Sequence, residues 1–303
     1  MKIFKCIPNF SEKTAIALGF FDGLHIAHQK VITLAVNSGY FPVVFTFSAG
    51  VNCPERKKDM LLLNDNYTKY NLIEKLGVKV LIEPSFENIQ NISAEDFINE
   101  YLVKKMNARV LVCGENFKFG SKALGNVEIL EQLSAKNDIE ALVVNSLKYE
   151  DGLVSSSSIR NALLNADLKM VRDMLGFDYF WDYVVVEGDK NGRKIGYPTI
   201  NQNFPFDCII PKIGVYVSRV NIDGKEYMGI TNIGVRPSIN LVKRPIAETY
   251  IIDYLGEELY GKRVKVSILE YVRDEKKFAS LKQLQKAIKK DLHIVEKYKY
   301  INV

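Results

Sequence analysis

Apolar residues in the first half of the chain fall into two kinds of stretch that follow one another in turn. Short unbroken apolar runs are typical of buried strands, and longer stretches with apolar residues three and four apart are typical of helices. Strand-like runs cover 14–21, 41–47, 78–84, 108–114 and 139–147, and helical spacing covers 28–39, 67–78 and 93–107. Strands that alternate with helices predict a Rossmann-like parallel α/β sheet with right-handed crossovers, in which ligands bind at the carboxyl ends of the strands.

The pattern changes near residues 176–183, after a stretch of helical spacing at 157–176. From there β-rich segments are separated by glycine, proline and asparagine. Asp223-Gly224, between two such segments, is a strong signal for a β-hairpin. The second half is therefore expected to form an antiparallel barrel or sandwich that ends in a helix. We expect two domains, 1–178 and 179–303.

Length and composition agree with two domains, since 303 residues are many for a single core. The net charge of +5 suits small anions such as nucleotides but does not argue for nucleic acid. The four cysteines have neither zinc-type nor disulfide-framework spacing, which indicates a reducing compartment. No apolar run approaches the roughly 20 residues that span a bilayer. We expect a cytoplasmic protein that does not bind membranes.

The first candidate site is the stretch GFFDGLHIAH at 19–28, which holds two of the three histidines in the chain. It lies where a predicted strand ends and a helix begins, so free backbone N–H groups there favour an anion. Gly19 and Gly23 allow the backbone to approach a ligand closely. His25 and His28 share one helical face, from which both can donate to phosphate oxygens. A tight turn with two surface histidines is the alternative, and the strand–turn–helix context favours the phosphate site.

Two further clusters belong to the same half. CGENFKFGSKALGN at 113–126 follows an apolar strand and has the layout of a ligand loop, in which Asn116 offers both donor and acceptor. Its two phenylalanines are either core residues or neighbours of a planar ring. VSSSSIRNALL at 154–164 places four hydroxyl groups and Arg160 at the start of a helix. The serines are either helix caps or, with the arginine, part of a phosphate site.

These three motifs, in this order and at these separations, resemble the nucleotidyltransferase domain of the prokaryotic bifunctional riboflavin kinase/FAD synthetase family. The family patterns resemble G-x-F-D-G-x-H-x-G-H, G-x-D/N-F-x-F-G and S-S-T-x-I-R. The resemblance implies that AMP is transferred from ATP to FMN with release of pyrophosphate, without a protein nucleophile and with the aid of Mg²⁺. His25 and His28 would be catalytic, stabilising the ATP phosphates in the transition state. The implied ATP- and phosphate-binding residues are Gly19, Phe21, Asp22, Gly23, Asn116, Ser156, Ser157 and Arg160.

Two positions depart from the family pattern. Ala27 stands where the family has the glycine of its histidine motif, and its methyl group lies where backbone is expected against the adenosine. The segment TFSAGVNCP at 46–54 lacks the Pro-His-Pro that the family usually carries after its second strand. Neither change removes an implied phosphate ligand, and either would weaken adenylyl transfer.

A second candidate site is GDKNGRKIGYPTIN at 188–201, a loop between β-like segments with three glycines and several basic residues. Such loops are common in hairpins, and this one lacks the spacing of a P-loop. Thr199 and Asn201 at its end offer a hydroxyl and an amide oxygen that suit a hard cation. The loop is therefore either an ordinary hairpin loop or a nucleotide site with a metal.

Together with 229–239, 247–264 and 271–288, this loop resembles the riboflavin kinase domain of the same family, which implies a six-stranded antiparallel β-barrel. The resemblance makes Glu248 the base that takes the proton from the ribityl 5′-hydroxyl as it attacks the γ-phosphate. Strand parity puts Glu248 on one face with Tyr250, where the family usually has histidine. The implied site residues are the catalytic Glu248, the ATP-binding Gly188, Lys190, Gly192, Gly196 and Pro198, the metal-binding Thr199 and Asn201, and the flavin-binding Arg273 and Phe278.

The resemblance thus implies a bifunctional enzyme that makes FMN from riboflavin in its C-terminal domain and FAD from FMN in its N-terminal domain. Each step would consume one ATP and need Mg²⁺, and the partners would be small molecules, with no nucleic acid and with a homo-oligomer left open. In one alternative, the departures leave the N-terminal domain as a nucleotide- or flavin-binding module beside an active kinase. In another, the chain is a non-enzymatic flavin-sensing regulator, and the retained kinase base and metal ligands argue against it.

Overall fold

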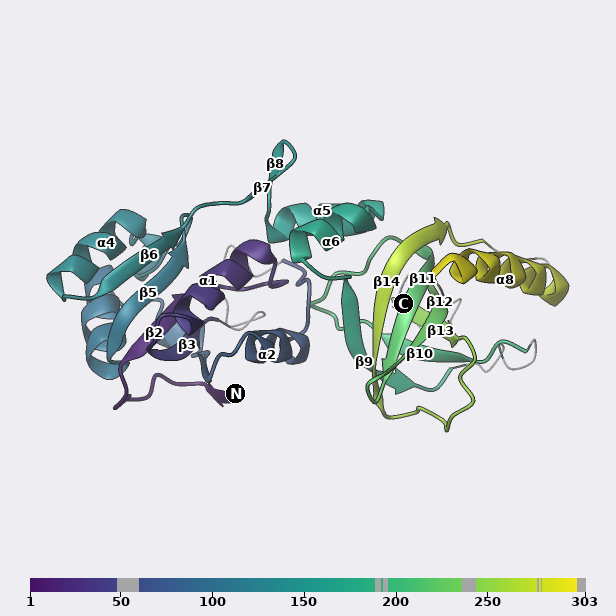
Figure 1. The fold of residues 1–303 in the computed structure, drawn as a ribbon, viewed down its shortest axis with the longest axis horizontal. Helices are drawn as coiled ribbons and strands as arrows, with labels where there is room; N and C mark the ends of the chain where they lie inside the picture. The colour runs from purple at the N-terminus through teal and green to yellow at the C-terminus, as the bar shows by residue number, and fades with distance from the viewer. Residues whose placement is uncertain are drawn as a thin grey trace. The chain divides into compact units, whose positions relative to one another are not determined.

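The computed structural model describes residues 1–47, 60–188, 192, 196–235, 244–276, 278 and 280–298. The chain divides into two compact units, Met1–Ser158 and Ile159–Val303 (Figure 1). The first is an α/β unit and the second contains a β-barrel. The domain boundary expected between residues 178 and 179 puts the helices α5 (Ser156–Asn165) and α6 (Leu168–Leu175) in the first domain, whereas the division at Ser158 puts most of α5 and all of α6 in the second unit. The expected boundary stays a proposal about where each activity ends.

The α/β unit is built on a six-stranded sheet in which every neighbouring pair is parallel, as expected. Its order is β1-β4-β3-β2-β5-β6. From β2 the chain adds β3 and β4 on one side, and then β5 and β6 on the other. The strand order therefore reverses between β2 and β5, and ligands bind at such a switch point in α/β sheets. The strands are β1 (Lys2–Phe4), β2 (Thr14–Leu18), β3 (Phe41–Phe45), β4 (Val80–Ile82), β5 (Ala108–Gly114) and β6 (Glu140–Val144).

Helices cover both faces of this sheet because its strands are apolar on both sides. Ala15 and Ala17 of β2 pack in one cluster with α1 and α2, while Ile16 and Leu18 pack in another with η3 and α4. The two-residue period of a strand sends successive side chains to opposite helix layers. The helices are α1 (Ile26–Val36), α2 (Asn66–Lys75), α3 (Ala94–Asp96), η3 (Phe97–Lys105) and α4 (Val127–Lys136), with short 3₁₀ turns η2 (Phe86–Asn88) and η4 (Ser121–Ala123) and the hairpin β7 (Lys148–Tyr149) with β8 (Gly152–Leu153).

Two helical stretches differ in detail from their sequence pattern. The stretch 93–107 starts as an α-helix and continues as the π-helix η3, in which the Met106 N–H donates to the Tyr101 carbonyl at 2.9 Å. The stretch 157–176 forms two helices rather than one. Ala166 has a φ of +60°, and the Asp167 carboxylate caps α6 by accepting from the Met170 N–H at 3.0 Å. The left-handed residue and the cap together end one helix and begin the next.

The second unit contains a closed barrel of six antiparallel strands, in the order β10-β13-β12-β11-β14-β9, which decides between the expected barrel and sandwich. The β9–β10 pair closes it. At the β11–β12 hairpin, Asp223 and Gly224 have φ values of 49° and 86°, as the type I′ turn of an Asp-Gly pair requires. The strands are β9 (Phe180–Val186), β10 (Thr199–Asn203), β11 (Gly214–Ile222), β12 (Lys225–Val235), β13 (Pro245–Ile251) and β14 (Arg263–Arg273).

The chain continues from the barrel into the expected helix, α8 (Leu281–Val295), and a short turn η5 (Glu296–Tyr298). Val295 is buried in one apolar cluster with Val215, Val217 and Leu269, so α8 packs on strands of the barrel. A search of the described residues finds no helix with the length and apolar character that crossing a bilayer demands.

Candidate functional site

The loop after β2 begins the candidate site of the α/β unit. Its backbone is unusual, because Phe21, Gly23 and Leu24 have φ values of 55°, 76° and 49°. A Cβ on Gly23 would lie 2.3 Å from the Leu63 Cδ1, and one on Gly19 would lie 2.8 Å from the ring of Phe21. Both glycines are therefore needed where they stand. Left-handed residues gather at sites where the surrounding structure holds the backbone in place.

His25 and His28 are brought together at the start of α1. His25 is the N-cap, and its Nδ1 accepts from the His28 N–H at 3.3 Å. Their rings stack with centroids 3.6 Å apart and planes 17° apart, and the His28 ring meets the Phe21 ring edge-on at 5.3 Å. Burial lowers the pKa of His25 to about 4. His25 is therefore neutral at neutral pH, and because Nδ1 accepts, Nε2 carries the proton as a donor.

A pocket of about 1010 Å³ opens at the switch point. Its volume is in the range of small-molecule and nucleotide sites. It is lined by the β2 loop and the first turn of α1, by 86–91, by 114–123 after β5, by 144–146 after β6 and by 154–157. The residues predicted for the adenylyltransferase that line it are Gly19, Phe21, His25, His28, Asn116, Ser156 and Ser157.

Three residues predicted for the same site, Asp22, Gly23 and Arg160, are not among the residues that line this pocket. The Asp22 carboxylate accepts from the Leu63 N–H at 2.9 Å, and the Asp22 carbonyl accepts from the Ser156 hydroxyl at 2.9 Å. Asp22 thereby ties the β2 loop to the serine motif. Arg160 lies further along α5, beyond the division between the two units.

The two phenylalanines of the 113–126 loop have both of the roles considered for them. Phe117 and Phe119 stack with centroids 5.6 Å apart, and both line the pocket. Phe119 is also part of the buried core, with Phe117 packed against it. Ala27 lines the pocket too. Of the 46–54 segment, Thr46 and Phe47 are described, and the remainder lies outside the described residues.

Some lining residues were not predicted from the sequence. Asn145 and Ser146 follow β6, and Lys118 and Lys122 lie in the loop after β5. The first two could have been found by extending the strand-end rule to one more strand. The charges of the two lysines are offset by Glu87 and Glu115, which line the same pocket.

The candidate site of the barrel lies on three adjacent strands, and strand register defines it. Asn201 of β10 is directly opposite Glu248 of β13, and Thr199 is directly opposite Tyr250. Directly opposite residues of antiparallel strands present their side chains on the same face, about 5 Å apart at Cβ. The predicted metal ligands and the predicted base therefore share one face, and Glu248 and Tyr250 are half-buried there. The Tyr250 ring meets the Tyr197 ring edge-on at 5.2 Å.

Asn232 of β12 completes a row of three with Asn201 and Glu248, because it is directly opposite Glu248 on the other side. The sequence did not single it out, although it lies within the 229–239 motif. Its neighbour Gly234 has no side chain, and a Cβ there would lie 2.0 Å from the Glu275 Oε1 and 3.0 Å from the Asn232 Nδ2. Gly234 thus makes room for a second carboxylate beside the row.

The glycine-rich loop is described only in part. Gly188, Gly192, Gly196 and Pro198 are described, while Lys190 lies outside the described residues. The Tyr197 N–H donates to the Gly192 carbonyl at 2.9 Å, and a Cβ on Gly192 would lie 2.3 Å from the Tyr197 carbonyl oxygen. Gly192 and Tyr197 are therefore in close backbone contact just before Thr199.

Arg273 and Phe278, predicted to bind the flavin, lie together, with the guanidinium carbon 5.8 Å from the ring centroid. The Arg273 guanidinium also holds the buried Asp291 of α8 with both of its carboxylate oxygens, Nε to Oδ1 at 3.0 Å and Nη2 to Oδ2 at 2.8 Å. One function of Arg273 is thus to fasten the C-terminal helix to β14.

The hydroxyl of Thr199 and the amide oxygen of Asn201 are ligand types that Mg²⁺ takes. This donor set fits the metal implied by the sequence. Among the described residues, no group of three or more histidine, cysteine, aspartate or glutamate side chains is arranged to hold a metal ion.

One chain thus joins a parallel sheet with a pocket at its switch point to a six-stranded barrel with a polar row. Residues 7–158 match the family model for FAD synthetase, and residues 175–299 match the model for riboflavin kinase. The chain belongs to the family of bifunctional riboflavin kinase/FMN adenylyltransferases.

Relatives with that name align over almost the full length. The bifunctional riboflavin kinase/FMN adenylyltransferase of Bacillus subtilis is 33% identical, over 94% of this chain and 92% of its own. That of Buchnera aphidicola subsp. Schizaphis graminum is 30% identical, over 98% and 99%. A crystal structure described as a macrolide-efflux protein from Streptococcus pneumoniae is 28% identical with a TM-score of 0.86, over 97% of this chain and 98% of that one.

Proposed function

We propose that this chain makes FAD from riboflavin in two ATP-dependent steps, one in each unit. In the barrel, riboflavin and ATP give FMN and ADP. In the α/β unit, FMN and ATP give FAD and pyrophosphate. The observation that carries the proposal is the pocket at the switch point, where three separate stretches of sequence contribute His25, His28, Asn116, Ser156 and Ser157 to one cavity.

The adenylyl transfer needs no group from the protein to attack the phosphate. A phosphate oxygen of FMN attacks the α-phosphorus of ATP, and the bond to pyrophosphate breaks. The protein's part is to hold both reactants in line and to stabilise the added negative charge. The neutral His25 donates from Nε2, and His28 and the Ser157 hydroxyl donate to the remaining phosphate oxygens.

The burial of the His25 imidazole supports this assignment. The buried environment that keeps His25 neutral also strengthens any hydrogen bond it donates to a charged phosphate oxygen. The N-terminus of α1 adds its own positive partial charge at the same place. Asn116 and the stacked rings of Phe117 and Phe119 would then contact the nucleoside of ATP or the flavin.

In the riboflavin kinase step, the 5′-hydroxyl of riboflavin attacks the γ-phosphorus of ATP and must lose its proton. Glu248 takes that proton, and Thr199 and Asn201 of the neighbouring strand hold Mg²⁺. When bound, the metal neutralises charge on the ATP phosphates. The register between β10 and β13 supports this arrangement, because it puts base and metal ligands side by side on one face.

We also propose that Mg²⁺ is the metal for both steps, that the protein acts in the cytoplasm, and that it acts on small molecules without nucleic acid or membrane partners. A homo-oligomer is compatible with this function. The domain boundary near residue 178 would leave α5 and α6 with the adenylyltransferase.

The experiment is a chromatographic assay of the purified full-length chain with riboflavin, ATP and Mg²⁺, following FMN and FAD over time. FMN that rises first and FAD that follows are expected. FMN that accumulates without FAD, even when FMN is supplied directly, would support the alternative of a binding module beside an active kinase. No conversion of either substrate would support the flavin-sensing regulator.

A further inference from the structure

A buried ammonium group lies beside the pocket of the α/β unit, on a helix that does not line it. Lys69, on α2, is only 7% exposed. Burial lowers its pKa to about 8, while Glu83 and Asp22 act in the opposite direction. A buried lysine is costly unless its charge is paired and its N–H groups are hydrogen-bonded. Its partners therefore indicate what it does.

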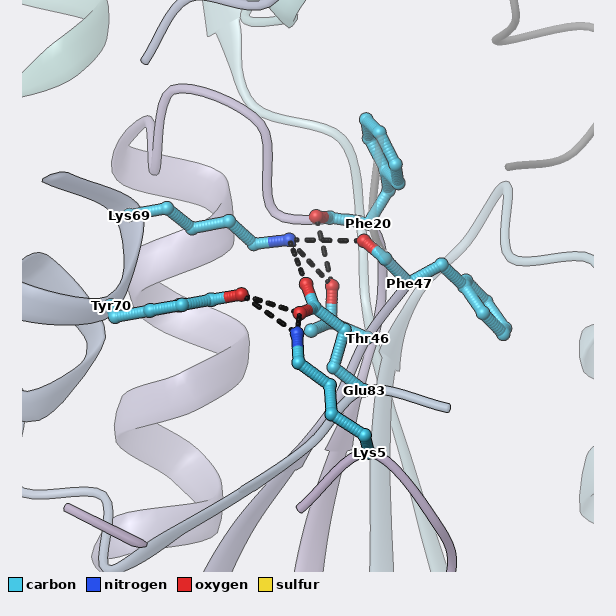
Figure 2. Close-up of polar contacts among 7 residues, drawn as sticks. All are labelled: Lys5, Phe20, Thr46, Phe47, Lys69, Tyr70 and Glu83. Carbon is cyan, nitrogen blue, oxygen red and sulfur yellow. Dashed lines mark hydrogen bonds and ion pairs between the residues drawn. The ribbon is translucent and has the colours of Figure 1, made fainter. Parts of the chain in front are cut away.

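The Lys69 ammonium joins the ends of two neighbouring strands (Figure 2). Nζ donates to the Thr46 hydroxyl at 2.9 Å and to the Phe47 carbonyl at 3.3 Å, both just after β3. The Thr46 hydroxyl in turn donates to the Phe20 carbonyl at 3.0 Å, in the loop after β2. Nζ also lies 5.2 Å from the centroid of the Phe20 ring. Phe20 and Phe47 both line the pocket.

A buried carboxylate balances this charge. Glu83, which follows β4, is 0% exposed, and its Oε1 lies 3.9 Å from the Lys69 Nζ. Its Oε2 accepts from the hydroxyl of Tyr70 and from the ammonium of Lys5. Lys5 differs from Lys69 in that its side chain is 62% exposed and reaches Glu83 and Tyr70 rather than the two loops. Two lysines therefore share the carboxylate of Glu83. Of the two, Lys69 is the one that donates hydrogen bonds to the loops of the pocket.

We propose that Lys69 is a positioning residue for adenylyl transfer, because it fixes the loop after β2 to the end of β3 through Thr46 and the two backbone carbonyls. Phe20 directly precedes Phe21, whose ring supports the His28 ring at 5.3 Å. A shift of the Phe20 carbonyl therefore moves the stacked imidazoles. The proposal rests on the function proposed for this pocket.

The test compares full-length variants by two rates measured on each preparation, FAD formation from FMN and phosphorylation of riboflavin. Lys69→Met keeps the length of the side chain and removes the ammonium. We expect its kcat for FAD formation to fall by about 10- to 100-fold, the cost of a small misplacement of reacting groups. Phosphorylation of riboflavin in the other unit should stay unchanged, and thermal unfolding of the variant shows whether the α/β unit is still folded.

Two matched controls separate positioning from charge balance. Lys5→Met also removes a cation from Glu83 and should leave the rate of FAD formation within about threefold, because Lys5 is an exposed ion-pair partner. The double variant Lys69→Met/Glu83→Gln removes both charges and should remain as slow as Lys69→Met. Recovery of the rate in the double variant would overturn the proposal, because the loss would then come from an unpaired Glu83.

The hydroxyl of Thr46 gives an independent test. Thr46→Val removes the link to the Phe20 carbonyl while keeping the shape, and should slow FAD formation about 10-fold. Thr46→Ser keeps the link and should restore most of the rate. Equal rates in the two variants would overturn the proposal. If the unmodified chain makes no FAD, the function proposed for the pocket fails. The positioning role of Lys69 is then tested by the binding of a non-hydrolysable ATP analogue to the same variants. Weaker binding by Lys69→Met and Thr46→Val supports the positioning role, and equal affinities overturn it.

Discussion

The imidazole of His25 accepts a hydrogen bond from the backbone N–H of His28 and stacks on its ring at 3.6 Å. One side chain thus caps the helix and faces the pocket at once. The cap needs a lone pair on Nδ1, so the neutral form is built into the fold. A histidine in this position serves as a hydrogen-bond donor from Nε2 rather than as a permanent cation.

This geometry predicts a pH-dependent stability. The pKa of His25 is about 4 in the fold, against 6.5 as its ordinary value. The unfolded chain therefore binds more protons between these values, and stability falls as pH drops from about 6.5 toward 4. The loss between pH 7 and pH 5 is about 2 kcal/mol. His25→Asn keeps a helix cap but does not titrate, so denaturant unfolding of the variant should show a smaller loss over the same range. An unchanged loss would contradict the prediction.

Ala27, one of the two departures from the family pattern, is among the residues that line the pocket. Ala27→Gly removes one methyl group and should lower the KM for ATP in FAD formation by a few-fold. The glycine costs the helix about 1 kcal/mol, which thermal unfolding would detect. Phosphorylation of riboflavin should not change. An unaltered or higher KM for ATP would mean that the methyl group does not restrict the nucleotide.

Glu248→Gln should reduce phosphorylation of riboflavin by at least about 100-fold, since a general base contributes roughly this much or more. The amide keeps the size of the side chain but does not accept a proton. FAD formation from supplied FMN should continue at its normal rate in the same preparation. A variant with normal phosphorylation would exclude Glu248 as the base.

Asn232 is expected to act beside Glu248, because the two are directly opposite on β12 and β13. Asn232→Ala should lower the rate of riboflavin phosphorylation about 10-fold through lost positioning. Asn203→Ala is the matched control, since Asn203 is an exposed residue of β10 opposite Ile246. Equal effects of the two substitutions would remove Asn232 from the site.

The two roles considered for Arg273 give different outcomes. If its main role is to hold α8, Asp291→Asn breaks a buried ion pair and should destabilise the second unit by about 3 kcal/mol. Arg273→Met should then destabilise it similarly, with little change in the KM for riboflavin. A large rise in that KM in Arg273→Met but not in Asp291→Asn would support direct binding of the flavin.

The parallel sheet was predictable because its strands are apolar runs buried on both faces. Strand β10 was harder, because its sequence TINQN is polar. Gln202 is nevertheless 1% exposed, and its amide satisfies three partners inside the barrel: it accepts from the Trp181 Nε1 at 2.8 Å and donates to the carbonyls of Tyr183 and Val264, each at 2.7 Å. A polar residue can be buried when all its hydrogen bonds are made, and the pattern of apolar positions in the sequence does not reveal such a residue.

The candidate sites were predictable to different degrees for a similar reason. Strand ends mark the pocket, so the motifs after β2 and β5 pointed to it. No local sequence signal points to Asn232, because its proposed role depends on strand register, which puts it opposite Glu248, 16 residues further along the chain. Asp22 holds a motif position, and its carboxylate also accepts from the Leu63 N–H, which the motif does not indicate. Its role in binding ATP stays a prediction.

The reversal of strand order between β2 and β5 has an evolutionary consequence. The loop after β2 leads into a helix that packs on one face of the sheet, and the segment after β5 leads into a helix that packs on the other. The two walls of the pocket are therefore anchored in separate hydrophobic layers. Substitutions can reshape one wall while the opposite layer keeps its packing, so such a pocket can change its substrate preference gradually without losing the fold.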